Sequence, residues 1–170
     1  MPPDISKNSI YIEKALEHVF LGSLIQYAWQ NELPQIEIAT SEIDNNGYDV
    51  ILSTGNISRF VQLKSSSIHS TRINADVNLR LMTKSSGCVV WLWYSPASLE
   101  IQSYLFFGNG PGVKLPDISS FKTAQYTRIN ASGVRPERKN TRLIPKNRFA
   151  AISSIAELYK TLFGDKDRAA

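Results

Sequence analysis

The chain has 170 residues, of which 42% are hydrophobic, 10% aromatic and 20% charged. This size and composition fit one compact domain and exclude a fully disordered chain or a coiled coil. The single cysteine, Cys88, excludes an internal disulfide, and with only two histidines beside it the sequence offers no ligand set for a structural zinc ion. The N-terminus has no signal-peptide pattern and no segment approaches about 18 apolar residues, so we expect a cytoplasmic protein without a membrane span.

The first part of the chain predicts a helix followed by three strands. Apolar residues recur at helical spacing from Ser9 until Pro34 ends the run. Three short segments rich in β-branched and aromatic residues then follow, bounded by Gly, Asn and Ser, at residues 35–40, 47–53 and 58–66.

The turn between the last two strands sets their register. Gly55-Asn56 suits a two-residue type II′ turn in which glycine supplies the positive φ. This turn would place Asp49 opposite Gln62, and the strand period of two would place Lys64 on the same face as Gln62. The three side chains are therefore expected to converge at one end of a hairpin. The same register pairs Ile51 with Phe60 and Val50 with Val61.

The second part of the chain predicts further strands and a closing helix. Residues 74–84 predict a short helix capped by Asn74. Strands are expected at residues 88–94, which are apolar throughout as in a strand covered on both faces, and at residues 99–108. A further strand is expected within residues 121–129, and a C-terminal helix over residues 153–164 ends at Gly164. The order predicts an α/β or α+β fold with a mixed central β-sheet flanked by helices.

The net charge of +4 is distributed unevenly along the chain. Residues 1–109 carry seven basic and ten acidic side chains, whereas residues 110–170 carry twelve and five. We expect a single domain over residues 1–164, with a core at 1–109, a basic region and the C-terminal helix at 110–164, and a tail at 165–170.

Eight basic residues between positions 122 and 148 are interleaved with amide and hydroxyl side chains and a single acid, Glu137. Such a mixture suits phosphate contacts, because the cations neutralise charge and the neutral polar groups fix register. A solvated basic loop with no ligand is the alternative. The candidate nucleic-acid-binding residues are Lys122, Arg128, Arg135, Arg138, Lys139, Arg142, Lys146 and Arg148.

The segment GYDVILSTGNISRFVQLK carries an aspartate on one strand and Gln-x-Lys on the next, after a helix that contains two glutamates. This pattern resembles the PD-(D/E)XK nuclease superfamily. The Gln-x-Lys form is similar to that of Mrr-like restriction endonucleases, and the helix-then-hairpin order is similar to that of archaeal Holliday-junction resolvases. The resemblance covers about the first half of the chain and implies a restriction-endonuclease-like core. Its implied catalytic residues are Asp49, Gln62 and Lys64, joined by Glu17 or Glu13.

These residue types suit metal-assisted hydrolysis of a phosphodiester. Mg²⁺ or Mn²⁺ prefers hard oxygen ligands, and Lys64 can position a water molecule and stabilise developing charge. Glu17 is preferred to Glu13, because Glu13 lies near the helix start, where the helix dipole already explains a carboxylate. The candidate metal ligands are the side chains of Asp49, Gln62 and Glu17 and the carbonyl of Leu63.

The expected function is metal-dependent hydrolysis of DNA by a PD-(D/E)XK-like endonuclease. A homodimer would supply the two sites that double-strand cleavage needs. The alternative is a catalytically weak or inactive nuclease-fold module that binds nucleic acid or a protein partner. A third interpretation is an α/β domain with no nucleic-acid role, in which the hairpin residues are ordinary surface.

Overall fold

The computed structural model describes residues 8–41 and 46–165. Its helices are α1 (Ser9–Gln30) and α2 (Ile155–Phe163), with short 3₁₀ turns at Leu79–Thr83 and Lys146–Arg148. Its strands are β1 (Glu37–Thr40), β2 (Val50–Thr54), β3 (Ile57–Ser67), β4 (Asn74–Asn78), β5 (Gly87–Tyr94), β6 (Ile101–Gly108), β7 (Thr123–Gln125), β8 (Glu137–Pro145) and β9 (Ala150–Ile152).

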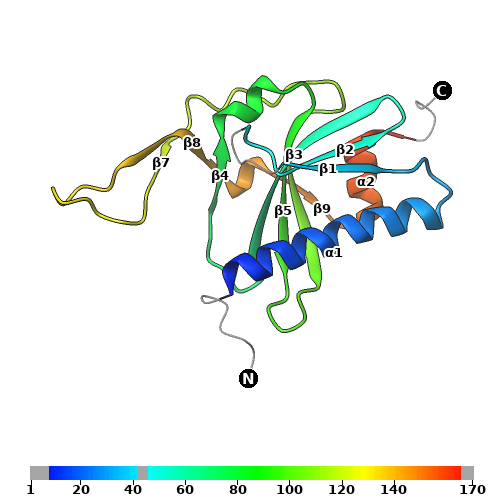
Figure 1. The fold of residues 1–170 in the computed structure, drawn as a ribbon, viewed down its shortest axis with the longest axis horizontal. Coiled ribbons are helices and arrows are strands. Elements are labelled where there is room, and N and C mark those ends of the chain that lie inside the picture. The colour runs from blue at the N-terminus through cyan, green and yellow to red at the C-terminus, as the bar shows by residue number, and fades with distance from the viewer. Residues whose placement is uncertain (1–7, 42–45, 166–170) are drawn as a thin grey trace.

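The strands form two sheets (Figure 1). The larger sheet has six strands in the order β1-β2-β3-β5-β6-β9, and the smaller one has three in the order β4-β8-β7. Within the larger sheet only β3 and β5 run parallel, and the other neighbours are antiparallel. The expected mixed sheet combined with helices is confirmed, and the fold is of the α+β type.

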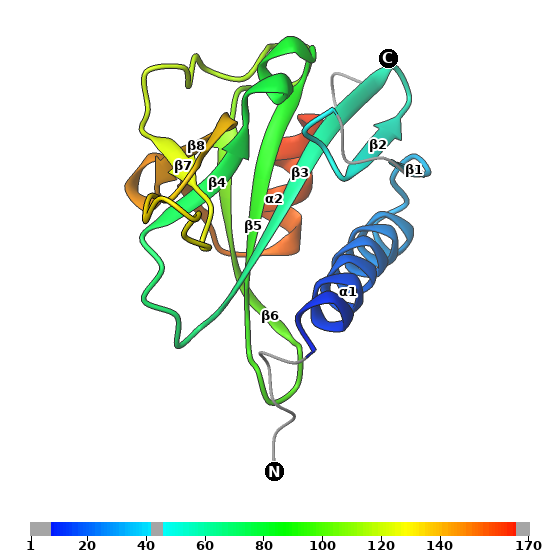
Figure 2. The same cartoon turned by 60° about the vertical axis from the view of Figure 1, so that its left-hand side comes forward.

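The two faces of the larger sheet carry separate hydrophobic cores. Both helices pack on one face, where Leu16 and Phe20 of α1 and Leu158 and Leu162 of α2 are buried. The three-stranded sheet covers the other face (Figure 2). Every residue of β5 is buried, because this central strand lies between the two layers. The uninterrupted apolar run at residues 88–94 is thereby explained.

Local sequence signals account for the hairpin and for the closing helix. Gly55 has φ +55°, and the pairing of Thr54 with Ile57 leaves a two-residue turn, so the predicted type of connection is confirmed. The predicted pairing of residues 50 and 51 with residues 61 and 60 is also found. At α2, the Ser154 side chain accepts a hydrogen bond from the Glu157 N–H, and Gly164 ends the helix with φ +84°.

The helix predicted at residues 74–84 is wrong. Residues 74–78 form β4, which pairs with β8, and its alternating Ala75 and Val77 side chains are buried. A short 3₁₀ turn follows, and Asn78 rather than Asn74 caps it by accepting from the Arg80 N–H. Tertiary pairing with β8 therefore decides the conformation of this segment.

The basic region contains more regular structure than the sequence predicts. The strand expected within residues 121–129 is limited to β7, whereas β8 and β9 were not predicted. Polar and charged side chains hide the period of β8, which is stabilised by its neighbours β4 and β7. None of the helices in the described part of the chain has the length and apolar character needed to cross a membrane.

Two glycines provide a matched test of the packing. A Cβ on Gly87 would lie 2.7 Å from the backbone oxygen of Leu81, whereas a Cβ on Gly22 in α1 would meet no atom within 4 Å. We expect Gly87→Ala to lower the free energy of unfolding by roughly 1–3 kcal/mol, because the backbone must shift. Gly22→Ala should raise it by about 0.5–1 kcal/mol. Urea denaturation of both variants measures the difference, and an unchanged stability for Gly87→Ala would contradict this packing.

Candidate functional site

A polar pocket of about 200 Å³ opens where α1, the residue before β2 and the second half of β3 meet. Four of the residues that the sequence singled out line it: Glu13, Glu17, Asp49 and Lys64. Its other lining residues are Leu16, Leu63, Ser65, Arg72 and Leu92. Glutamates, aspartate and lysine from three separate segments are thus brought together.

The pocket exists because β3 is longer than the strand it pairs with. β2 begins at Val50, which pairs with Val61, so residues 62–67 of β3 run past its start. On the opposite edge, β3 remains paired with β5 as far as Ser67. The first turns of α1 supply the facing wall. The opening therefore lies at the point where the sheet loses one strand.

Two hydrogen bonds to β3 hold Asp49 at this opening. Its backbone N–H donates to the Val61 carbonyl over 2.9 Å. Its carboxylate Oδ2 accepts from the Leu63 N–H over 2.6 Å. The side chain of Asp49 thus pairs with a strand residue that lies beyond the end of β2. Because the Asp49 N–H bonds to Val61, the predicted placement of Asp49 directly opposite Gln62 is not observed.

Both candidate glutamates of α1 reach the pocket, and they differ in burial. Glu17 is 8% exposed, whereas Glu13, one turn earlier, is exposed. The Glu17 Oε2 atom accepts a hydrogen bond from the Lys14 Nζ atom over 3.1 Å. A carboxylate this buried needs such a partner, because burial without one is costly.

The charges of Glu13, Glu17 and Asp49 all act on the ammonium group of Lys14. Its pKa is raised above the ordinary value, first by the hydrogen bond and charge of Glu17 and then by the charges of Asp49 and Glu13. Its ammonium group therefore lies in a region of negative potential. Lys14 was not among the predicted site residues, although its spacing of three residues from Glu17 on a helix is a recognisable signal.

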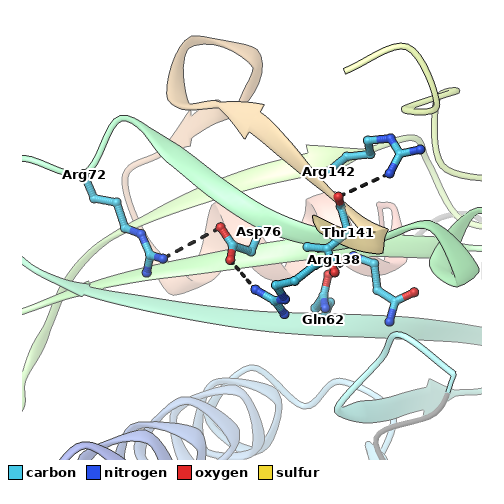
Figure 3. A network of polar contacts seen from close by, with 7 residues as sticks. Gln62, Arg72, Asp76, Arg138, Thr141 and Arg142 are labelled. Carbon is cyan, nitrogen blue, oxygen red and sulfur yellow. Dashed lines mark hydrogen bonds and ion pairs between the residues drawn. The ribbon is translucent and has the colours of Figure 1, made fainter. Parts of the chain in front are cut away.

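Gln62 does not line the pocket. Its Oε1 atom accepts a hydrogen bond from the Asn78 N–H over 3.2 Å, so the side chain joins β3 to the end of β4. Figure 3 shows Gln62 near Arg138 and Thr141. Gln62 is buried, and its observed contact is with the three-stranded sheet rather than with Asp49 or Glu17.

Arg72 brings a second cation to the pocket, and no local pattern predicts it. The Arg72 Nη2 atom lies 3.8 Å from Asp76 Oδ1, and the Arg138 Nη1 atom lies 2.6 Å from Asp76 Oδ2 (Figure 3). Asp76 on β4 thus links a pocket residue to the basic region. Since Arg72 lies in the connection between β3 and β4, only the folded chain brings it to this pocket.

Two carboxylates of the pocket are of the ligand type that a magnesium ion prefers. Mg²⁺ is typically held by one or two carboxylates together with waters and substrate phosphates, rather than by a complete protein cage. Glu17 and Asp49 can supply those carboxylates, and the position of Lys14 indicates that a cation is favoured there. The described residues contain no group of three His, Cys, Asp or Glu side chains placed to hold an ion, and Gln62 is directed elsewhere.

The eight basic residues of the C-terminal part fall into two groups. Four are engaged within the protein: Arg138 with Asp76, Arg142 with backbone carbonyls, Lys146 over the ring of Trp93, and Arg148 over the ring of Phe121. The side chains of the other four are exposed and form no hydrogen bond or ion pair with the described residues: Lys122, Arg128, Arg135 and Lys139.

The charge arrangement of the pocket can be tested through the titration of Lys14. We expect Glu17→Gln to lower the pKa of Lys14 towards its ordinary value, because Glu17 is the largest cause of the increase. Glu13→Gln should lower it less, and Glu157→Gln on α2 should leave it unchanged. NMR titration of the lysine Cε–Hε signals measures each value. Identical Lys14 titrations in wild type and Glu17→Gln would contradict the arrangement.

Comparison with known proteins adds no family assignment. The chain has no significant match to a protein-family model, to a curated protein or to a solved structure. Its candidate function therefore rests on the residues and geometry described above.

Proposed function

We propose that the pocket hydrolyses phosphodiester bonds of DNA with the help of Mg²⁺ or Mn²⁺, as the resemblance to PD-(D/E)XK nucleases implies. The observation that supports this proposal is the convergence of Glu13, Glu17, Asp49 and Lys64 on one pocket. These residues belong to α1, to the segment before β2 and to β3. Carboxylates beside a cation are the combination that metal-assisted phosphodiester hydrolysis uses.

The chemistry of each side chain suggests its role. Asp49 and Glu17 would hold the ion, which when bound supplies charge neutralisation at the phosphate and activation of a water molecule. Lys64 would donate hydrogen bonds to the reacting phosphate and stabilise its developing charge. Arg72 would offer its planar guanidinium group to a nonbridging oxygen. Lys14 would neutralise Glu17 in the free protein.

The proposed substrate is DNA, and the exposed basic residues of the C-terminal part would hold its backbone. Arginine and lysine side chains that neutralise phosphates supply most of such affinity and make it depend on salt. Cutting both strands of a duplex needs two active sites, which a homodimer would provide. The proposal includes a cytoplasmic location, where the free Cys88 thiol stays reduced.

The position of Gln62 favours a second candidate function, a nuclease-like module that binds nucleic acid or a protein with little or no cleavage. Its amide oxygen accepts from the Asn78 N–H and does not join the pocket carboxylates. A site with two carboxylates holds a divalent ion less tightly than one with an additional oxygen ligand. Such a module would bind DNA and leave it intact.

A cleavage panel tests the proposal. Single-stranded, duplex and branched DNA, with matching RNAs, are incubated with Mg²⁺, Mn²⁺ or EDTA. The wild type is expected to cut DNA only with metal. Asp49→Asn keeps an oxygen for the Leu63 N–H but removes the charge, and Lys64→Met removes the cation. Each should lower the rate by about 100-fold or more, the effect typical of losing one stabilising group.

Exposed residues outside the pocket provide matched controls. Asp117→Asn and Lys160→Met change the same types of side chain and should cut DNA at the wild-type rate. Cleavage that survives both pocket substitutions would contradict the assigned site. Metal-independent binding without cleavage of any substrate would support the second candidate function instead.

A further inference from the structure

The basic region forms a projecting arm, which we define as residues 123–142. β4 pairs with β8 only from Thr141 to Pro145, so the earlier part of β8 has β7 as its strand partner. β7, its connection to β8 and the start of β8 project away from β4 and from the six-stranded sheet (Figure 1). The arm is a two-stranded ribbon attached to the protein at one end.

Polar contacts at the base of the arm hold it to the protein. Arg138 forms its 2.6 Å ion pair with Asp76 of β4 and lies 5.9 Å from the centre of the Tyr126 ring. Arg142 donates to the carbonyls of Ser119 and Lys139 over 3.2 and 2.8 Å. These two arginines are therefore used to build the arm, and other cations must carry any contact with a ligand.

The tip of the arm is an ordered turn centred on Asn130. The Asn130 Oδ1 atom accepts hydrogen bonds from the N–H groups of Ser132 and Val134 over 3.1 and 2.9 Å. The Asn130 N–H donates to the Val134 carbonyl, and the Gly133 N–H donates to the Asn130 carbonyl. Gly133 has φ +76°, a conformation that glycine adopts without strain. A turn fixed in this way loses little conformational entropy when it binds a partner.

Two apolar and two cationic side chains flank this turn. Ile129 and Val134, which flank it, are 60% and 59% exposed. Arg128 and Arg135 are their outer neighbours in sequence, are exposed, and form no hydrogen bond or ion pair within the described ranges. Two exposed apolar side chains bordered by two unpaired guanidinium groups offer apolar and cationic contacts to the same ligand, and a polyanion with an apolar interior could use both.

Duplex DNA has this combination of chemistry. Its major groove is about 12 Å wide and admits a two-stranded β-ribbon, its floor exposes thymine methyl groups, and its rims are phosphates. We propose that the tip of the arm enters the major groove of duplex DNA, with Arg128 and Arg135 on the flanking phosphates and Ile129 and Val134 against base edges. This inference rests on the proposed function only in taking DNA as the ligand.

Binding without cleavage isolates the role of the arm. Fluorescence anisotropy with a labelled 20-base-pair duplex in EDTA uses Asp49→Asn as the parent chain, because this substitution lies in the pocket and not in the arm. Adding Arg128→Ala and Arg135→Ala should weaken binding by about tenfold or more and reduce the slope of log K against log salt by about 1.8, since each phosphate contact contributes about 0.9.

Removing the apolar tip should have a different signature. Adding Ile129→Ser and Val134→Ser should weaken duplex binding by about fivefold to tenfold and leave the salt slope unchanged, because no phosphate contact is lost. Lys160→Ala on α2 is the matched control and should bind like the parent. All the substituted side chains are exposed, so melting temperatures should be unchanged.

Dimethyl sulfate footprinting identifies the groove. The parent should protect guanine N7 in the major groove, and the Ile129→Ser/Val134→Ser variant should lose that protection. Protection of adenine N3 in the minor groove instead, or parent-like binding by both arm variants, would overturn the inference. If the wild type still cut DNA in that case, the proposed function would stand. Absence of any duplex binding by the parent would overturn both.

Discussion

The candidate site depends on the difference in length between two neighbouring strands. β3 has 11 residues and β2 has 5. The pairing of the two strands ends at Val50 and Val61, so no residue of β2 can accept a hydrogen bond from the N–H of Leu63. Leu63 is half-buried, and its N–H finds its acceptor in the carboxylate of Asp49 at 2.6 Å. This bond holds an acidic side chain at an opening whose other wall is α1. A structural requirement and a candidate chemical role therefore fall on the same residue.

In both the pocket and the arm, some charged side chains remain available to a ligand. Glu13, Glu17 and Asp49 face cations from three different segments, and the Lys14 side chain is 65% exposed. The Glu17 carboxylate is buried, so the exposed Lys14 side chain can leave it at little cost only when another cation takes its place. In the arm, the base arginines are engaged and the tip arginines are not. Asp76 connects the two regions, because it contacts both Arg72 of the pocket and Arg138 of the arm.

Local chemistry in the sequence predicts the parts of the structure that depend on neighbouring residues. The turn at Gly55 fixes the hairpin register and so brings Asp49 near β3. The environment of Gln62 could not be predicted. The prediction assumed that the pairing of β2 with β3 continues to Asp49, but it ends at Val50. β8 has polar residues and becomes a strand only through its neighbours. Arg72 reaches the pocket only in the folded chain, whereas Lys14 carried a helical spacing signal that the acidic motif obscured.

A divalent cation is proposed to bind between α1 and β3, and this claim can be tested directly. Substoichiometric Mn²⁺ broadens the NMR signals of nuclei close to it, and backbone amides can be followed one by one. The predicted result is early loss of the Glu17, Asp49, Leu63 and Ser65 amide signals, reversed by excess Mg²⁺. Uniform broadening, or selective broadening around Asp117 or Glu157 with these four signals intact, would contradict the claim.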